Sequence, residues 1–152
     1  MALSAADPGN PYGSILRWPD LPVAAEDAES APRVLTRAAY AEVILRNGQL
    51  VAWLRRNNPN LLVFLPPDEP DRSQAASGLA HFLSARGQER MRAGGREGML
   101  ITAINGQPVA AHLMARFLMD AGFYAGPLGM HLRRILLPVG HRAHDSHAGE
   151  VQ

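Results

Sequence analysis

The residues that decide the fold are 41–55, which read AEVILRNGQLVAWLR. At their centre, Asn47-Gly48 separates two apolar runs, and this dipeptide favours a two-residue type I′ turn because both turn residues need a positive φ. Such a turn pairs Arg46 with Gln49, Leu45 with Leu50, Val43 with Ala52, and Ala41 with Leu54. The last three pairs are apolar and share one face, as a buried face requires. We therefore predict an antiparallel hairpin with one face toward the core.

The opposite face of this hairpin is mixed in character. It carries Tyr40, Glu42, Ile44, Arg46, Val51, Trp53 and Arg55. Guanidinium groups beside aromatic rings are typical of surfaces that contact phosphates and stack on bases, although a strand end in water has the same composition. We predict that this face lies in water or against a partner.

Two helices are expected further along the chain. Residues 73–85 place apolar side chains at helical spacing, and Gly87 could cap this helix, or the helix could continue toward Arg92. The second helix is expected at residues 112–121, with Gly122 directly after its end.

The remaining strands follow from apolar runs and turn signals. Residues 61–65 are apolar without alternation, which predicts a strand covered on both faces. Further strands are expected at 99–104 and 129–137. A second Asn-Gly turn at 105–106 predicts a return strand that is short or at an edge, because Pro108 cannot donate to a ladder. The order is β-β-β-α-β-β-α-β, an α+β domain whose mostly antiparallel sheet could form a partly closed barrel.

Length and composition set the class of protein. The chain has 152 residues and no cysteine, which excludes a disulfide scaffold, thiolate metal sites and a cysteine nucleophile. No apolar run approaches the ~20 residues of a membrane helix, and no signal peptide is evident. We therefore expect a cytoplasmic protein with no membrane partner.

Three segments differ in composition. Residues 1–32 hold five of the twelve prolines and predict an extended arm, although the apolar residues between Pro11 and Pro19 are expected to lie against a surface. Residues 33–138 are the expected α+β domain, and residues 139–152 the expected disordered tail.

The basic residues are all arginine and are concentrated in the middle of the chain. Residues 33–140 hold thirteen arginines against seven acidic residues. Guanidinium groups suit phosphate contacts, although a GC-rich genome gives the same bias. The candidate nucleic-acid-binding residues are Tyr40, Arg46, Trp53, Arg55, Arg56, Arg133 and Arg134.

Familiar catalytic motifs are missing from the sequence. It has no lysine and so no G-x-x-x-x-G-K-[ST] phosphate loop, and neither G-x-S-x-G nor H-E-x-x-H occurs. His141, His144 and His147 could hold zinc or nickel, but their spacing suits no regular helical face and no acidic residue is placed to orient them. We expect no catalytic residue, no metal and no cofactor in this segment.

The order of several short motifs resembles one known family. DPGNPYG at 7–13, followed by Trp18-Pro19, resembles "DPANPYG…WP" near the end of the Lhr-type (long helicase-related) DEAD/H-box helicases. Residues 43–54 resemble that family's hairpin "VVLVDGELVAYLER", and residues 117–132 resemble its closing "LLEAGFxxTPRGLRLR".

The resemblance implies a C-terminal accessory domain, or a fragment, of an ATP-dependent DNA helicase, with DNA repair as the setting. ATP and magnesium would be used by motor domains outside this segment. The implied partners are DNA, in single-stranded form, and neighbouring helicase domains. The alternative is a stand-alone interaction module without DNA binding or catalysis.

Overall fold

The hairpin expected at Asn47-Gly48 forms the centre of the larger of two sheets. The structure is a computed structural model that describes residues 1–20, 35–55, 58–94 and 98–132. Strands β2 (Ala41–Arg46) and β3 (Gln49–Arg55) run antiparallel, and the two turn residues have φ values of 52° and 78°. Leu45 lies opposite Leu50 as predicted, and both are buried.

Beyond that pair the predicted register is wrong. An irregularity between Ile44 and Leu45 sets Val43 opposite Trp53 and Ala41 opposite Arg55. A bulge of this kind adds one residue to one strand and so changes the face of every residue that follows it. Trp53 therefore lies on the same buried face as Val43 and not on an open face.

The larger sheet has six strands in the order β1-β2-β3-β4-β6-β7. The strands beside the hairpin are β1 (Ala2–Ser4), β4 (Asn60–Val63), β6 (Ala103–Ile104) and β7 (Gln107–Pro108). Strand β4 pairs with β6 in parallel, and the other described pairs are antiparallel. The return strand β7 is short and at the edge, as predicted from its proline, whereas β1 was not predicted.

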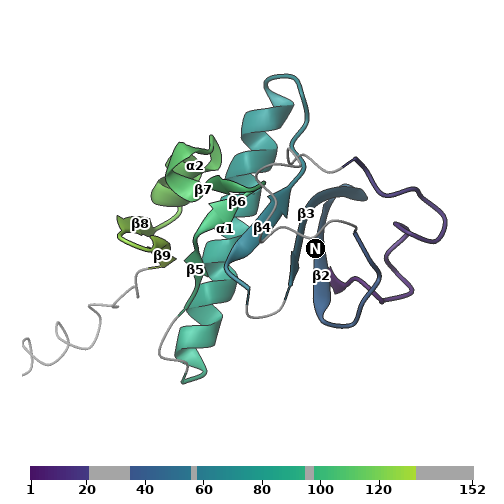
Figure 1. Cartoon of the computed structure of the whole chain (residues 1–152), viewed down its shortest axis with the longest axis horizontal. Helices are drawn as coiled ribbons and strands as arrows, with labels where there is room; N and C mark the ends of the chain where they lie inside the picture. Colours follow the sequence, from purple (N-terminus) through teal and green to yellow (C-terminus); the bar gives the residue numbers. More distant parts are fainter. Residues whose placement is uncertain (21–34, 56–57, 95–97, 133–152) are drawn as a thin grey trace, which may run out of the picture.

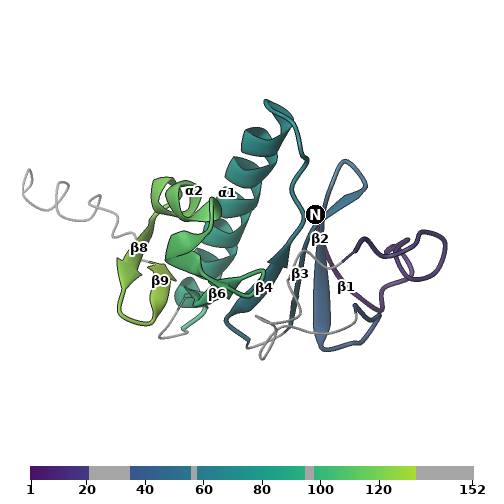
Figure 2. The ribbon, with the colours of Figure 1, turned by 45° about the horizontal axis from the view of Figure 1, so that its top comes forward.

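The helices pack on one face of this sheet (Figures 1 and 2). Helix α1 (Asp71–Arg92) begins two residues earlier than expected and continues to Arg92, the longer of the two alternatives, so Gly87 lies inside it and does not cap it. After a short 3-10 helix η2 (Val109–Ala111), helix α2 (Met114–Asp120) ends before Gly122, which has a positive φ of 110°. No helix among the described residues is long and apolar enough to cross a membrane.

The second sheet has three strands in the order β5-β9-β8. They are β5 (Leu100–Ile101), β9 (Gly129–Leu132) and β8 (Phe123–Gly126). The continuous strand expected at 99–104 is divided at Thr102, so that β5 joins the small sheet and β6 the large one. The predicted α+β class is confirmed, but the described strands form two open sheets and no closed barrel.

Buried residues form two clusters on opposite faces of the larger sheet. The cluster between the sheet and the helices includes Ile44, Leu83 and Leu118. The other cluster includes Val43 and Trp53, and the N-terminal arm packs against it. In Figure 2 the arm and helix α1 accordingly lie on opposite sides of strands β2 to β4. Residues 21–34 and 133–152 lie outside the described residues, so the boundaries at 32 and 138 stay predictions.

Candidate nucleic-acid interface

Three of the predicted site residues meet at the end of strand β3. The guanidinium of Arg55 lies 5.7 Å from the ring centroid of Tyr40 and 5.8 Å from that of Trp53. A cation above aromatic rings is attracted to their π faces, so the rings hold the Arg55 side chain in place. Tyr40 remains 53% exposed, and the buried Nε of Arg55 has no hydrogen-bond partner among the described atoms.

Trp53 is not available for stacking on a base in this structure. Its side chain is 2% exposed, and the indole N–H donates a hydrogen bond of 3.3 Å to the carbonyl oxygen of Thr36. Tyr12 and Trp18 of the arm pack against the same cluster. The aromatic ring that the predicted site offers to a ligand is therefore Tyr40.

The other predicted residues lie elsewhere or outside the described part of the chain. Arg46 is half-buried at the turn end of strand β2, opposite Gln49, whereas Arg55 is at the other end of the hairpin. Arg56, Arg133 and Arg134 lie outside the described residues. That these three arginines bind nucleic acid stays a prediction.

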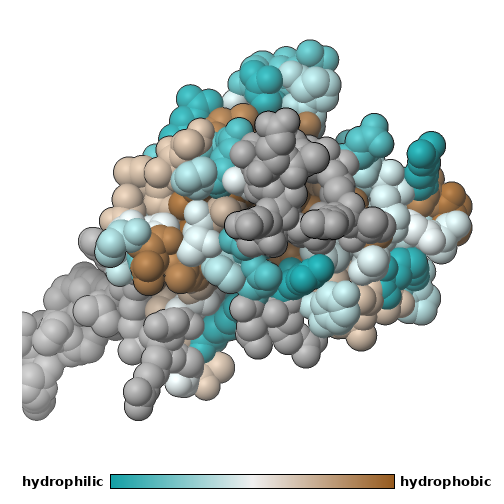
Figure 3. All heavy atoms as spheres, viewed as in Figure 1, coloured by the Kyte–Doolittle hydropathy of each residue, from teal (hydrophilic) through white to brown (hydrophobic). Residues whose placement is uncertain are grey.

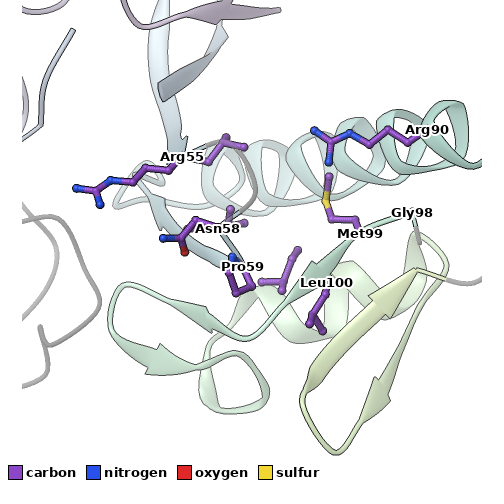
Figure 4. A pocket seen from close by; sticks show the side chains of 10 residues that line it. Arg55, Asn58, Pro59, Arg90, Gly98, Met99 and Leu100 are labelled. Atoms are coloured by element: carbon purple, nitrogen blue, oxygen red, sulfur yellow. The ribbon is translucent and has the colours of Figure 1, made fainter. Parts of the chain in front are cut away.

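A pocket of about 350 Å³ opens beside Arg55 (Figure 4). It is formed where the end of β3, the start of β4, the last turns of α1 and strand β5 meet. Its lining residues are Leu54, Arg55, Asn58, Pro59, Leu61, Arg90, Gly98, Met99, Leu100 and Ile101. Leu54, Leu61 and Ile101 are buried and form an apolar floor. A concave apolar site with a few polar groups at its rim is the usual form of a ligand site.

Asn58 supplies an amide at the rim of the pocket. Its Oδ1 accepts a hydrogen bond of 2.9 Å from the backbone N–H of Asn60, and its own backbone N–H donates to the carbonyl oxygen of Arg55. These bonds are those of an asparagine turn, and they fix the side-chain direction. The Nδ2 group donates to no described atom.

Arg90 is a second cation at the pocket, and sequence reasoning missed it. It is exposed in the last turn of α1, and its side chain reaches from the helix toward Met99 in Figure 4. Arg55 extends in another direction, away from Met99 and Leu100. No spacing rule connects residues 55 and 90, because only the packing of α1 across the sheet brings them to one site.

Exposed hydrophobic residues gather away from this pocket. Figure 3 shows them at the tip of the N-terminal arm and over the β8–β9 hairpin. At the arm, Ile15 is 86% exposed, and at the hairpin Leu128 is 67% exposed. Tyr124 in β8 is 41% exposed, and Met119 near the end of α2 is 54% exposed.

Comparison with known proteins identifies relatives of almost the whole chain. It is 32% identical over 130 residues to the Lhr helicase/uracil glycosylase of Escherichia coli strain K12, and the matched region is 86% of this chain and 7% of that protein. It is 31% identical over 140 residues to the Lhr helicase/probable uracil glycosylase of Mycolicibacterium smegmatis, covering 88% of this chain and 8% of that protein. No protein-family model matches the chain.

The matched region agrees with the motif order that pointed to the same family. It spans nearly all of this chain but less than a tenth of either relative, so it corresponds to one short part of a much longer protein. This chain is thus similar to one short helicase-associated segment of the Lhr helicases.

Proposed function

We propose that this domain is an accessory domain of an Lhr-type ATP-dependent DNA helicase and that it contacts single-stranded DNA. The observation that carries the proposal is the placement of Arg55 over the exposed ring of Tyr40, at the mouth of a pocket that Arg90 also lines. Guanidinium groups neutralise phosphates, and a ring such as Tyr40 stacks on any base. The segment itself supplies binding and no motor chemistry.

The whole-protein functions follow from the family and are part of this proposal. ATP hydrolysis with magnesium would be performed by motor domains elsewhere in the helicase, DNA repair would be its setting and the cytoplasm its location. Both relatives carry the name of a uracil glycosylase as well. Our proposal for this chain concerns binding alone.

Fluorescence anisotropy with a labelled oligothymidylate at low salt tests the proposal. We expect measurable binding whose logarithm falls linearly with the logarithm of salt concentration. The double variant Arg55→Gln with Arg90→Gln should bind more weakly, and its salt slope should be shallower by about 0.7 for each phosphate contact that is lost.

A charge-matched control separates a site from a general positive field. Arg17→Gln with Arg72→Gln removes the same charge from the arm and from the first turn of α1, where Arg72 pairs with Glu69. We expect this control to bind nearly as the parent chain does. Equal weakening by both double variants would reject a localised interface, and absence of salt-dependent binding would reject the DNA role.

The exposed hydrophobic residues favour a second role, docking against neighbouring helicase domains. Ile15 and Leu128 each expose most of their side chains at opposite ends of the domain. Exposed apolar side chains at each end are groups that a neighbouring domain would cover on docking. If docking is the function, the isolated chain should self-associate in sedimentation experiments, Ile15→Ser with Leu128→Ser should abolish this association, and DNA affinity should be absent.

A further inference from the structure

We propose that the open edge of strand β5, together with the pocket beside it, binds an extended peptide of a partner protein that carries an aliphatic side chain next to an acidic residue. The peptide pairs with the backbone of Leu100 and places its aliphatic side chain in the pocket. This inference goes beyond the proposed DNA contact, because it depends on the backbone of β5 and on the apolar walls, which that contact does not need.

Strand β5 is an edge strand of the smaller sheet, and the order β5-β9-β8 leaves it paired on one side only. Along an antiparallel pair, residues that exchange hydrogen bonds alternate with residues that do not. The Leu132 N–H donates to the Met99 carbonyl oxygen at 3.0 Å, so these two residues form a bonded pair. The next pair, Leu100 with His131, is therefore unbonded. The N–H and C=O of Leu100 thus point away from β9, and neither is bonded to another described atom.

These two backbone groups are directed toward the pocket. In an extended chain, N–H groups two residues apart point the same way. The N–H of Thr102, two residues after Leu100, donates to the carbonyl oxygen of Pro59 at 2.9 Å. The N–H of Leu100 accordingly points to the side on which Asn58 and Pro59 line the pocket (Figure 4), and none of the described lining residues belongs to β9.

An asparagine turn keeps strand β4 from closing this edge. Strand β4 pairs with β6 in parallel from Asn60 onward. Continuing that register backward would set Asn58 opposite Ile101, within reach of the Leu100 carbonyl oxygen. Asn58 instead gives its N–H to the carbonyl oxygen of Arg55 at 3.2 Å, and its Oδ1 accepts the N–H of Asn60. A main chain that enters between β4 and β5 therefore meets one unused donor and one unused acceptor.

The pocket determines which side chain the peptide inserts. Its volume is about 350 Å³, and its floor is made by the buried residues Leu54, Leu61 and Ile101. An aliphatic side chain loses contact with water on such a floor and needs no polar partner there. The charged residues in the described lining are Arg55 and Arg90, both cationic, so a carboxylate beside the anchor is favoured. Strand addition at a sheet edge, with a pocket for a side chain, is a recurring mode of peptide recognition.

The decisive experiment uses a labelled synthetic peptide, Ser-Asp-Val-Leu-Val-Asp-Ser with blocked ends, and measures its fluorescence anisotropy with the full chain. One control peptide is N-methylated at its three central residues, which removes main-chain donors and keeps the side chains and charge. Other controls replace both aspartates by serine or by lysine.

The matched variants are Leu100→Pro and Leu100→Ala. Both remove most of the leucine side chain, but only proline removes the N–H, and a proline is tolerated on an edge strand where that N–H faces outward. Thermal melting reports whether each variant keeps its fold. The N-methylated peptide tests the same backbone pairing on the parent chain, so the proposal stays falsifiable if Leu100→Pro does not fold.

We expect the parent chain to bind the aspartate peptide at least about tenfold more tightly than the N-methylated one, the effect of losing main-chain hydrogen bonds. Leu100→Pro should weaken binding about fivefold more than Leu100→Ala does. Arg90→Gln should weaken binding of the aspartate peptide and leave that of the serine peptide unchanged.

Four results would overturn the proposal. They are no binding of the aspartate peptide, equal binding of its N-methylated form, equal binding of the lysine peptide, and self-association that Leu100→Pro abolishes, which would assign this edge to a second copy of the chain. Salt-dependent binding of oligothymidylate without peptide binding would reject this inference and leave the DNA contact standing. Peptide binding without DNA binding would support this inference and reject only the DNA contact.

Discussion

The side chain of Asn105 pairs with the backbone of Val63 as a neighbouring strand would. Its Oδ1 accepts the Val63 N–H at 2.8 Å, and its Nδ2 donates to the Val63 carbonyl oxygen at 3.1 Å. Asn105 has a φ of 54°, the backbone conformation of the turn that follows β6. Its side chain also continues the pairing of β4 beyond the point where β6 ends. One residue therefore carries two structural roles.

Asn105→Ala should be among the more destabilising single substitutions in the domain. It removes both hydrogen bonds to Val63 and places a residue with a Cβ at positive φ, for a combined loss of about 2–4 kcal/mol in the free energy of unfolding. Asn105→Gly removes the bonds without the backbone strain and should lose about 1 kcal/mol less. Urea unfolding measures the free energy of unfolding of both variants. Equal losses for Asn105→Ala and Asn105→Gly would show that the positive φ causes no strain in the alanine variant.

Gly78→Ala should stabilise the protein. Gly78 is exposed in the middle of α1, and a Cβ there would meet no atom within 4 Å. Alanine in a helix interior is more favourable than glycine by about 0.5–1 kcal/mol, and the melting temperature should rise. Gly87→Ala is the matched control in the same helix, because its Cβ would clash with the Leu132 side chain and the melting temperature should fall.

Arg37→Lys should loosen the N-terminal arm. Arg37 donates to the carbonyl oxygens of Asn10, Tyr12 and Asp7 at 2.7, 2.8 and 3.1 Å. Lysine cannot reproduce this planar set of donors, so amides of residues 10–16 should exchange with deuterium faster. The amide of Phe64, bonded within the sheet, should keep its exchange rate. An unchanged rate across residues 10–16 would show that Arg37 does not hold the arm.

His112 should make stability depend on pH. Burial lowers the pKa of His112 below its ordinary value of 6.5, and its Nδ1 accepts the backbone N–H of Met114 at 3.1 Å, which requires that nitrogen to be unprotonated. Below pH 6.5 the unfolded chain therefore takes up a proton that the folded chain resists, and stability falls as the pH falls toward the folded-state pKa. Above pH 6.5, His112 adds no further pH dependence to the stability of the domain.

His112→Asn tests this relation, because asparagine can accept the Met114 N–H without titrating. Urea unfolding between pH 7 and 5 should show a smaller loss of stability for this variant than for the parent chain. His81→Gln changes an exposed histidine on α1 and serves as the control. Identical pH profiles for His112→Asn and the parent chain would contradict the role of His112.

Local signals in the sequence predicted the elements better than their connections. The Asn-Gly dipeptides at 47–48 and 105–106 set both turns, because only a few residue types accept a positive φ there. The helical period located α1 but left its C-terminal end open between Gly87 and Arg92. The bulge at Ile44 and Leu45 has no sequence signature, and it alone moved Trp53 to the buried face.

The site was predictable only where its residues lie close together in the sequence. Tyr40 and Arg55 are close in sequence to the hairpin that positions them, and the structure brings them together. Arg90 and Asn58 come to the pocket through the packing of α1 and through an asparagine turn. Their relation to Arg55 depends on contacts between distant segments, which composition and spacing do not encode.

The division of residues 100–104 between two sheets makes them a mechanical link. Leu100 and Ile101 pair with β9, whereas Ala103 and Ile104 pair with β4 and β7. Between them, Thr102 is fastened to the β4 side by its N–H to Pro59 and by its hydroxyl to Asn60. A load applied to the end of β9 would thus pass through Leu100 and Ile101, which line the pocket, to Thr102 and then to β4 of the larger sheet.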